Sequence, residues 1–374
     1  MPVLLDRVSR DHHLFMGDDG DCAKALADSV DGMAGLNIGL VNNMPDSALV
    51  PTERQLFELL NAAAGKLPVH LRLYTLPTIP RAEWGQRYIS RFYSSVEDLR
   101  GGQLDGLIVT GTEPRAPNLA EEPYWDSFVR LVDWAKENTA SAIWSCLAVH
   151  GAVLYLDGIN RSPLANKCIG VFDQDRMTDH PLLHGISSQL KIPHSRWNEI
   201  GEVSLGSSGY SIITKSAAAG VDAFVKQQRN SLFVYFQGHP EYDAQSLLGE
   251  YRRDVGRFLR REIESYPTMP KGYFDADAED LLTAFQRHAL SDRRIEVFGS
   301  FPVDTVAANL KNSWRSAAIR IYQNWISYLS SRADRQQKSP GDFVPSIGSA
   351  VAQSGSHHAD RHRRKHRLSG PPSA

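Results

Sequence analysis

Short apolar runs alternate along this chain with amphipathic segments of helical length. The apolar runs predict strands over residues 36–41, 69–74, 107–110 and 142–145. The amphipathic segments between and after them predict helices over residues 51–63, 124–138 and 147–154. This alternation is the βαβ rhythm of a mostly parallel sheet that is covered by helices on both faces. We therefore expect an α/β fold.

The second half of the chain has a different pattern. Residues 170–236 contain short strands and turns, and they predict a small antiparallel extension that ends in a buried strand over 233–236. C-terminal helices are predicted over 244–264 and 314–330. The last of these carries an apolar stripe that should pack on the core, formed by Ile319, Tyr322, Ile326 and Leu329.

Both ends of the chain differ in composition from the middle. Residues 1–34 are polar and irregular and predict a loosely attached N-terminal arm, so the main domain is expected over 35–332. Residues 333–374 are rich in Ser, Gly, Pro, Gln, His and Arg, and predict a disordered basic tail. The run Arg361–Arg367 in this tail is expected to be solvated, with weak binding of a phosphate or a partner as the alternative.

Composition narrows the class of protein. The 374 residues are 42% hydrophobic and 22% charged, which is typical of a soluble globular enzyme. A formal net charge of −2 creates no field for nucleic acid or a membrane. The cysteines, Cys22, Cys146 and Cys168, have no metal-binding spacing, and their odd number argues against a disulfide framework. We therefore expect a cytoplasmic protein without a signal peptide, membrane span or bound metal.

Cys146 has the setting of a nucleophile. It stands between a predicted strand and a predicted helix, where a thiol is exposed at the edge of the sheet. The positive end of the helix dipole favours a thiolate there. A lone cysteine is nevertheless more often a small core residue, and the other two cysteines lack this setting. In a parallel sheet the site lies at the carboxyl ends of the strands, where Gly111 and Asn43 also fall.

A second chemical motif follows the buried strand over 233–236. In extended backbone residues i and i+2 point to the same side, so His239 and Glu241 can face one site while Pro240 stiffens their link. An isolated histidine is mostly structural or solvated. Together with Cys146, however, the pair provides a nucleophile, a general base and a carboxylate that orients the base.

These residues belong to an ordered series of motifs that resembles one family. The series runs from about Leu36 to Leu329 and comprises Asn43-Met44-Pro45, Thr52-Glu53-Arg54-Gln55, Asp105-Gly106-Leu107-Ile108-Val109-Thr110-Gly111, Tyr124-Trp125, Pro193-His194-Ser195-Arg196, Gly238-His239-Pro240-Glu241-Tyr242-Asp243, Arg253-Asp254, Trp314-Arg315-Ser316 and Asn324-Trp325. It is similar to the homoserine O-acyltransferase family of methionine biosynthesis, usually called homoserine O-succinyltransferase. The fold of that family resembles the class I glutamine amidotransferases.

The resemblance implies roles for particular residues. Cys146 would form the acyl thioester, His239 would accept the proton, and Glu241 would orient it. The family's substrate-binding positions fall on Lys167, Ser195 and Arg253, whose charges and hydroxyl suit an amino acid substrate. The substrates would be L-homoserine and an acyl-coenzyme A, with no permanently bound cofactor.

The expected mechanism has two steps. The Cys146 thiolate takes the acyl group from coenzyme A, and the homoserine hydroxyl then takes it from Cys146 with His239 as base. The backbone N–H of Leu147 and one from the turn at Gly111 are candidate oxyanion donors.

The chain departs from the family pattern at several positions. Asp46 and Ser47 stand where lysines are usual, and Leu147 stands where a Trp is common. Arg115 aligns with a position that is Gly with succinyl transfer and Glu with acetyl transfer. A guanidinium facing the acyl pocket would pair with a succinyl carboxylate, so we expect succinyl preference. The alternatives are that Arg115 points to solvent, or that its bulk favours the smaller acetyl group.

Other functions remain open at this stage. Serine or another hydroxy amino acid could replace homoserine, since one methylene is worth only about 1–3 kcal/mol in a pocket. A glutamine amidotransferase or hydrolase would use the same fold and triad. A non-catalytic regulatory protein is a further alternative. A homodimer through the C-terminal helices is compatible with the sequence.

Overall fold

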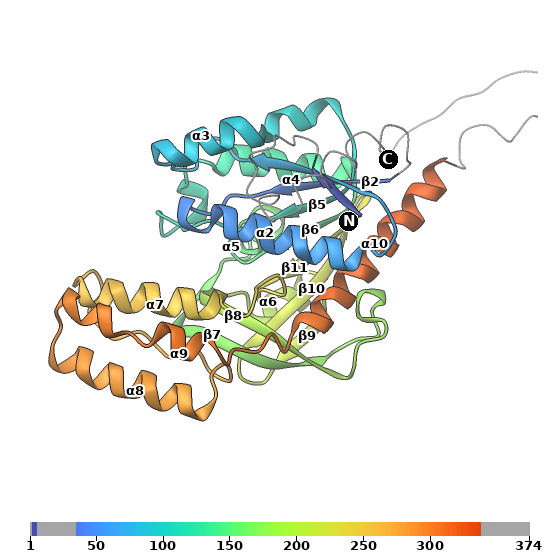
Figure 1. Cartoon of the computed structure of the whole chain (residues 1–374). Coiled ribbons are helices and arrows are strands. Elements are labelled where there is room, and N and C mark those ends of the chain that lie inside the picture. Colours follow the sequence, from blue (N-terminus) through green and yellow to red (C-terminus); the bar gives the residue numbers. More distant parts are fainter. Residues whose placement is uncertain (1, 6–34, 338–374) are drawn as a thin grey trace, which may run out of the picture.

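The computed structural model describes residues 2–5 and 35–337, and within these residues eleven strands form one sheet (Figure 1). The strand order is β1-β3-β2-β5-β6-β11-β10-β9-β7-β8, with β4 paired to β3. Cys22, most of the expected N-terminal arm and the tail from residue 338, with its basic run, lie outside the described residues.

The strands are β1 (Val3–Leu5), β2 (Leu36–Val41), β3 (Val69–Thr75), β4 (Ser94–Ser95), β5 (Leu104–Val109), β6 (Thr139–Ser145), β7 (Ser162–Arg176), β8 (Gln189–Glu199), β9 (Ser211–Ser216), β10 (Gly220–Gln228) and β11 (Ser231–Phe236). The α-helices are α2 (Asp46–Ala63), α3 (Glu83–Phe92), α4 (Trp125–Asn138), α5 (Leu147–Asp157), α6 (Glu202–Ser207), α7 (Ser246–Leu259), α8 (Ala276–Ser291), α9 (Val303–Ala307) and α10 (Arg315–Gln337).

The predicted α/β fold is confirmed. Strands β1, β3, β2, β5, β6 and β11 pair in parallel along this order, whereas the pairs from β11 through β10, β9 and β7 to β8 are antiparallel. The antiparallel extension is therefore also confirmed. Because β11 returns beside β6 in parallel, the ends of these two strands meet at one edge of the sheet.

The two faces of the parallel strands are buried by different helices. Alternate strand residues such as Ile143 and Val234 pack with α2 and α10, and the intervening residues such as Trp144 and Tyr235 pack with α4 and α5. This period of two explains why the predicted strands are apolar throughout, since both faces of a parallel sheet are covered.

A third cluster of buried residues joins α7, α8 and α9 to β7. These helices lie together beside the antiparallel extension (Figure 1). In it, Leu282 and Phe285 of α8 pack with Val255 of α7 and Val171 of β7. The sequence patterns predicted α7 and α10 but neither α8 nor α9. The buried face of α7 therefore packs against this cluster.

The two terminal boundaries differ from those expected. Val3–Leu5 was assigned to the N-terminal arm but forms β1 on the edge of the sheet, parallel to β3, because Val3 and Leu5 are buried against the core. At the other end, α10 continues past the expected boundary at 332 to Gln337. The division into arm, domain and tail otherwise stays a prediction.

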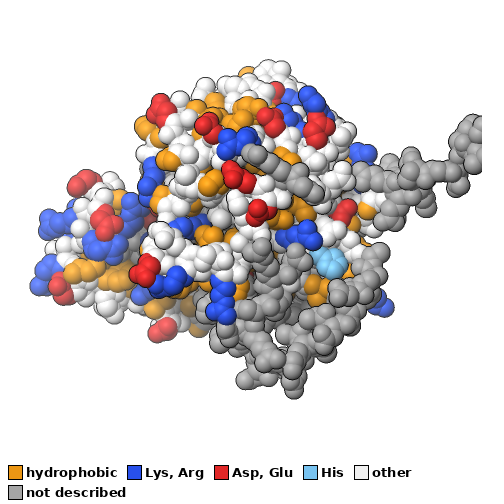
Figure 2. Space-filling model, turned by 90° about the horizontal axis from the view of Figure 1, so that it is seen from above, with side chains coloured by type: hydrophobic (Ala, Val, Ile, Leu, Met, Phe, Trp, Pro, Cys, Tyr) orange, Lys and Arg blue, Asp and Glu red, His pale blue; other side chains and the backbone are white. Residues whose placement is uncertain are grey.

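The surface carries mixed charges. Figure 2 shows acidic and basic side chains interspersed over one face of the molecule. In the described part of the chain, no helix has both the length and the apolar character needed to cross a bilayer.

Trp325 of α10 provides a test of this packing. Its side chain is fully buried, its indole N–H donates to Ser141 Oγ over 2.9 Å, and it lies against Gly106, where a Cβ would come within 2.8 Å of the ring. Trp325→Ala should therefore lower the free energy of unfolding by about 3–5 kcal/mol in urea denaturation. Trp197→Ala, at a side chain that is 59% exposed, is the control and should change it by less than about 0.5 kcal/mol. An equal loss of unfolding free energy in both variants would contradict the role of Trp325 in the core.

Candidate active site

Cys146 lies at a sharp turn between β6 and α5. Its backbone has φ 52° and ψ −114°, a conformation that L-residues rarely adopt. Strain of this kind costs about 1–3 kcal/mol and gathers at functional sites. Its amide N–H donates to Phe236 O over 2.9 Å, which continues the β6–β11 ladder by one residue. The partly exposed thiol therefore projects from the edge of the sheet where β11 also ends.

Gly111, after β5, lies against the first residue of α5. A Cβ at Gly111 would come within 2.8 Å of the amide nitrogen of Leu147, so only glycine permits this approach. The backbones of the two predicted oxyanion residues are thus adjacent, and both lie next to Cys146.

His239 and Glu241 follow β11. Nδ1 of His239 lies 2.8 Å from Oε1 of Glu241, and both side chains are buried. The His239 amide donates to Pro193 O over 2.8 Å. On one side the imidazole stacks on Tyr242, with ring centroids 4.2 Å apart and an angle of 16° between the planes. Because Nδ1 faces Glu241, Nε2 is left for a reacting group.

Charges around His239 control its protonation. Burial alone would lower the pKa of His239, but the charges of Glu241 and Cys146, and hydrogen bonds to both, raise it well above its usual value. The structure therefore brings the three predicted side chains together. An imidazolium beside a thiolate is the activated state of a cysteine nucleophile.

The other predicted site residues gather around Glu250 of α7, which the sequence analysis missed. Ser195 Oγ donates to Glu250, and Lys167 Nζ lies 3.3 Å from it. Arg253 lies 3.8 Å from the same carboxylate and 3.2 Å from Asp254, which also binds Lys167 over 2.8 Å. Three positions far apart in the sequence thus form one cluster.

Glu250 also connects this cluster to the triad. Tyr242, whose ring stacks on His239, donates its hydroxyl to Oε1 of Glu250 over 2.6 Å. Burial would raise the pKa of Glu250, but Lys167, Ser195, Tyr242 and His239 together hold it below its usual value. A signal for Glu250 was present, because it precedes Arg253 by three residues and so shares its helix face.

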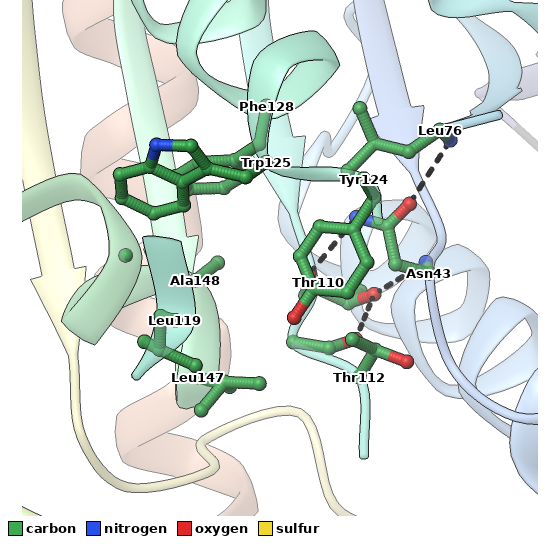
Figure 3. Close-up of a pocket in the computed structure, with 12 residues that line it drawn as sticks. Asn43, Leu76, Thr110, Thr112, Leu119, Tyr124, Trp125, Phe128, Leu147 and Ala148 are labelled. Carbon is green, nitrogen blue, oxygen red and sulfur yellow. Dashed lines mark hydrogen bonds between the residues drawn. The ribbon is translucent and has the colours of Figure 1, made fainter. Parts of the chain in front are cut away.

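A small apolar cavity lies at the start of α5, the helix that follows Cys146 (Figure 3). Its wall includes Leu147, Trp125 and Phe128, and one corner carries the polar groups of Asn43 and Thr110. Asn43 is fixed by bonds to Thr110 and Leu76, drawn as dashed lines in Figure 3. Gly111 and Leu147, the two predicted oxyanion residues, both line it. Leu147, the departure from Trp, forms part of it.

Arg115 does not line this cavity. Its residue is exposed, and its backbone N–H donates to the buried carboxylate of Glu122 over 2.5 Å. Arg161 holds the same loop through a 3.0 Å bond to Pro117 O. The loop that carries Arg115 is therefore held in place, and Arg115 itself is exposed.

Asp46 has a structural partner. Its carboxylate lies 3.2 Å from Arg81 Nη1 and accepts the Ala82 N–H over 2.7 Å, so it joins the starts of α2 and α3. The side chain of Arg81 is only 5% exposed. A positive charge near the turn after β2 thus comes from Arg81, where the usual lysines are missing.

Comparisons with known proteins agree with this geometry. The chain matches the sequence model of the homoserine O-succinyltransferase family over residues 10–335. It is 47% identical over 296 residues to a homoserine O-succinyltransferase of Rhodopseudomonas palustris, covering 79% of this chain and 89% of that protein. The corresponding protein of Bradyrhizobium japonicum is 46% identical over 299 residues, covering 79% and 90%.

Similar chains are also found among solved structures. A glutamine amidotransferase from Thermotoga maritima superimposes with a TM-score of 0.47 at 10% identity, covering 79% of this chain and 99% of that one. A glutamine amidotransferase from Methylobacillus flagellatus gives a TM-score of 0.46 at 14% identity, covering 79% and 96%.

The contact between Cys146 and His239 makes a testable prediction. At pH 7 iodoacetamide should modify Cys146 faster than Cys168, because burial raises the pKa of the Cys168 thiol. Glu241→Gln removes a charge that raises the pKa of His239, so alkylation of Cys146 should slow by about tenfold for each pKa unit lost. Peptide mass spectrometry would follow each cysteine, with Cys168 as the internal control. Unchanged Cys146 rates in the variant would contradict the role of Glu241.

Proposed function

Because the chain belongs to the homoserine O-succinyltransferase family, we propose that it moves a succinyl group from succinyl-coenzyme A, through a thioester on Cys146, to the hydroxyl of L-homoserine in methionine biosynthesis. The observation that carries the proposal is the junction of the Cys146–His239–Glu241 triad with the charged cluster around Glu250. An acyl-transfer nucleophile lies beside charges that suit an amino acid.

In the first half-reaction, the sulfur of Cys146 attacks the thioester carbonyl of the acyl donor. The carbonyl oxygen becomes an oxyanion, for which the adjacent backbones at Leu147 and Gly111 offer donors. The bond to the sulfur of coenzyme A then breaks, and His239 gives its proton to that leaving group. Glu241 holds the imidazole through Nδ1 at each stage.

In the second half-reaction, His239 removes the proton of the homoserine hydroxyl as its oxygen attacks the acyl carbon. The thioester bond to Cys146 breaks and the O-acyl ester forms. Cys146 leaves as a thiolate while His239 keeps the proton from homoserine, which restores the starting pair. Atoms and charges balance with no further reactant.

The cluster around Glu250 suits the two charges of the acceptor. Arg253 is half exposed and can bind a carboxylate with two parallel hydrogen bonds. The Glu250 carboxylate can accept from an ammonium group, and Ser195 and Lys167 lie beside it. The two cations, Lys167 and Arg253, balance two anions, Glu250 and Asp254, so a zwitterion binds without leaving an unpaired charge.

Acyl choice is assigned to Arg115 and the apolar cavity. The cavity at the start of α5 accepts the methylenes of the acyl chain, and Arg115, on the anchored loop after β5, acts through its charge from outside the cavity wall. A succinyl group ends in a carboxylate that such a cation attracts, whereas an acetyl group has none.

The nucleophile can be tested directly. After incubation with succinyl-coenzyme A and no homoserine, intact-mass and peptide analysis should find one succinyl adduct on Cys146. Cys146→Ala should carry no adduct and show no turnover, yet unfold like the wild type, because the alanine keeps the same turn. Cys168→Ala is the matched control and should remain active. Normal turnover by the Cys146 variant would refute the mechanism.

The acyl assignment is tested by comparing donors. Arg115→Glu should lower kcat/KM for succinyl-coenzyme A relative to acetyl-coenzyme A by up to about fivefold, because an exposed ion pair is worth at most about 1 kcal/mol. Arg115→Gln keeps most of the bulk without the charge, so its ratio of kcat/KM for the two donors should lie between those of the wild type and Arg115→Glu. Exclusive use of acetyl-coenzyme A by the wild type would refute the charge argument.

A further inference from the structure

Three successive backbone N–H groups, those of residues 237–239, hold the start of the catalytic loop, the segment 237–242 that follows β11 and carries His239 and Glu241. Gln237 N–H donates to Asp222 O over 2.9 Å, and His239 N–H donates to Pro193 O over 2.8 Å. Between them, Gly238 N–H donates to a side chain, Oδ1 of Asp222, over 3.1 Å. Asp222 therefore binds this segment with its carbonyl and its carboxylate, on the residue directly before the catalytic imidazole.

Asp222 is held by its neighbours on other strands. It is only 1% exposed on β10. Thr214 of β9 donates its hydroxyl to Oδ2 over 2.8 Å, and Nε2 of His194 on β8 lies 3.5 Å from Oδ1. Thr214 Oγ1 also accepts the Ala223 N–H over 3.0 Å, which fixes the hydroxyl itself. Two residues outside the segment 237–239 thus also hold this carboxylate.

The orientation of His194 follows from Arg196. Arg196 Nε donates to Nδ1 of His194 over 3.4 Å, so the neutral ring carries its proton on Nε2, which faces Oδ1 of Asp222. Burial, with the charges of Arg196 and His239, lowers the pKa of His194 well below its usual value, which keeps the ring neutral. Arg196 is fixed in turn by bonds to Asn198 O and Ala219 O.

Gly238 lies too close to Asp222, Ile192 and His194 to carry a side chain. A Cβ would come within 2.6 Å of Asp222 Oδ1, 2.6 Å of Ile192 and 2.9 Å of His194 Nε2. The catalytic loop therefore packs closely on Asp222 and His194 at Gly238. Glu241 and Tyr242 contact the imidazole of His239 itself.

We propose that Asp222 is a positioning residue for His239: its carboxylate, set by Thr214 and His194, fixes the Gly238 amide and so keeps the imidazole between Glu241 and Cys146. The role rests on the proposed acyl transfer, to which Asp222 adds no contact with substrate. Alkylation of Cys146 tests the role without any acyl substrate, so its failure and that of the proposed function can be told apart.

The experiment compares Asp222→Ala with Asp222→Asn. In the alanine variant, iodoacetamide should alkylate Cys146 about tenfold more slowly at pH 7. Its kcat should fall roughly 10- to 100-fold, the loss typical of a misplaced catalytic group, while its KM values stay within about threefold of wild type. Its alkylation should reach the wild-type rate only at higher pH, because the sulfur has lost its imidazolium partner. The asparagine variant keeps an acceptor oxygen for Gly238 and should stay within about threefold of wild type in both rates.

Asp105→Ala is the matched structural control. Asp105 Oδ2 also accepts a backbone amide, Asn37 N–H over 2.8 Å, but next to the starts of β2 and β5, away from Cys146. The Asp105→Ala variant should have a lower midpoint of thermal unfolding, with the rate of Cys146 alkylation and kcat unchanged. Wild-type alkylation by a folded Asp222→Ala, or equal losses in Asp222→Asn and Asp222→Ala, would overturn the proposal.

A second variant covers the case in which Asp222→Ala does not fold. Gly238→Ala leaves Asp222 intact but forces the same amide away from it, because the new Cβ overlaps Oδ1. It should show the same slow alkylation and the same loss of kcat with little change in KM. A fully active Gly238→Ala would overturn the proposal.

Discussion

The site depends on the parallel pairing of β6 with β11. Ser145 lies opposite Phe236, and the next amide, that of Cys146, donates to Phe236 O. A nucleophile one residue beyond one strand and a base three residues beyond its neighbour must then meet at the same edge of the sheet. Since backbone hydrogen bonds set this register, a slip of one residue would turn every side chain of the strand to the other face.

Burial on both faces stabilises this register. Trp144 and Tyr235 pack on one side of the sheet, and Ile143 and Val234 pack on the other, so neither strand can shift without exposing or overlapping large side chains. Such support explains how Cys146 persists in a strained conformation, whose cost of about 1–3 kcal/mol is small beside the burial around it. The rigid ladder thus allows an exposed, reactive turn at its end.

Local patterns were sufficient to predict the parallel sheet and the residues that end its strands. The alternation of apolar runs with helical segments indicated the α/β fold, and the settings of Cys146 and of His239 with Glu241 indicated their chemistry. Glu250 and Asp222 were missed because their partners are remote in sequence: Lys167 is 83 residues from Glu250, and Gly238 is 16 residues from Asp222. Contacts of this kind arise only when strands and helices pack together. The strand β1 was missed because three apolar residues are too short a signal.

Tyr242 makes the acceptor cluster and the triad interdependent. Its ring covers the His239 imidazole, while its hydroxyl binds the Glu250 carboxylate that Ser195 and Lys167 also contact. In the proposed reaction, an ammonium group that replaces Lys167 at Glu250 leaves the bonds from Ser195 and Tyr242 in place, so the carboxylate keeps its direction. The imidazole therefore remains aligned while the acceptor binds. A low-dielectric interior strengthens each of these bonds, and it equally penalises any charge left unpaired, which favours an acceptor that carries both an anion and a cation.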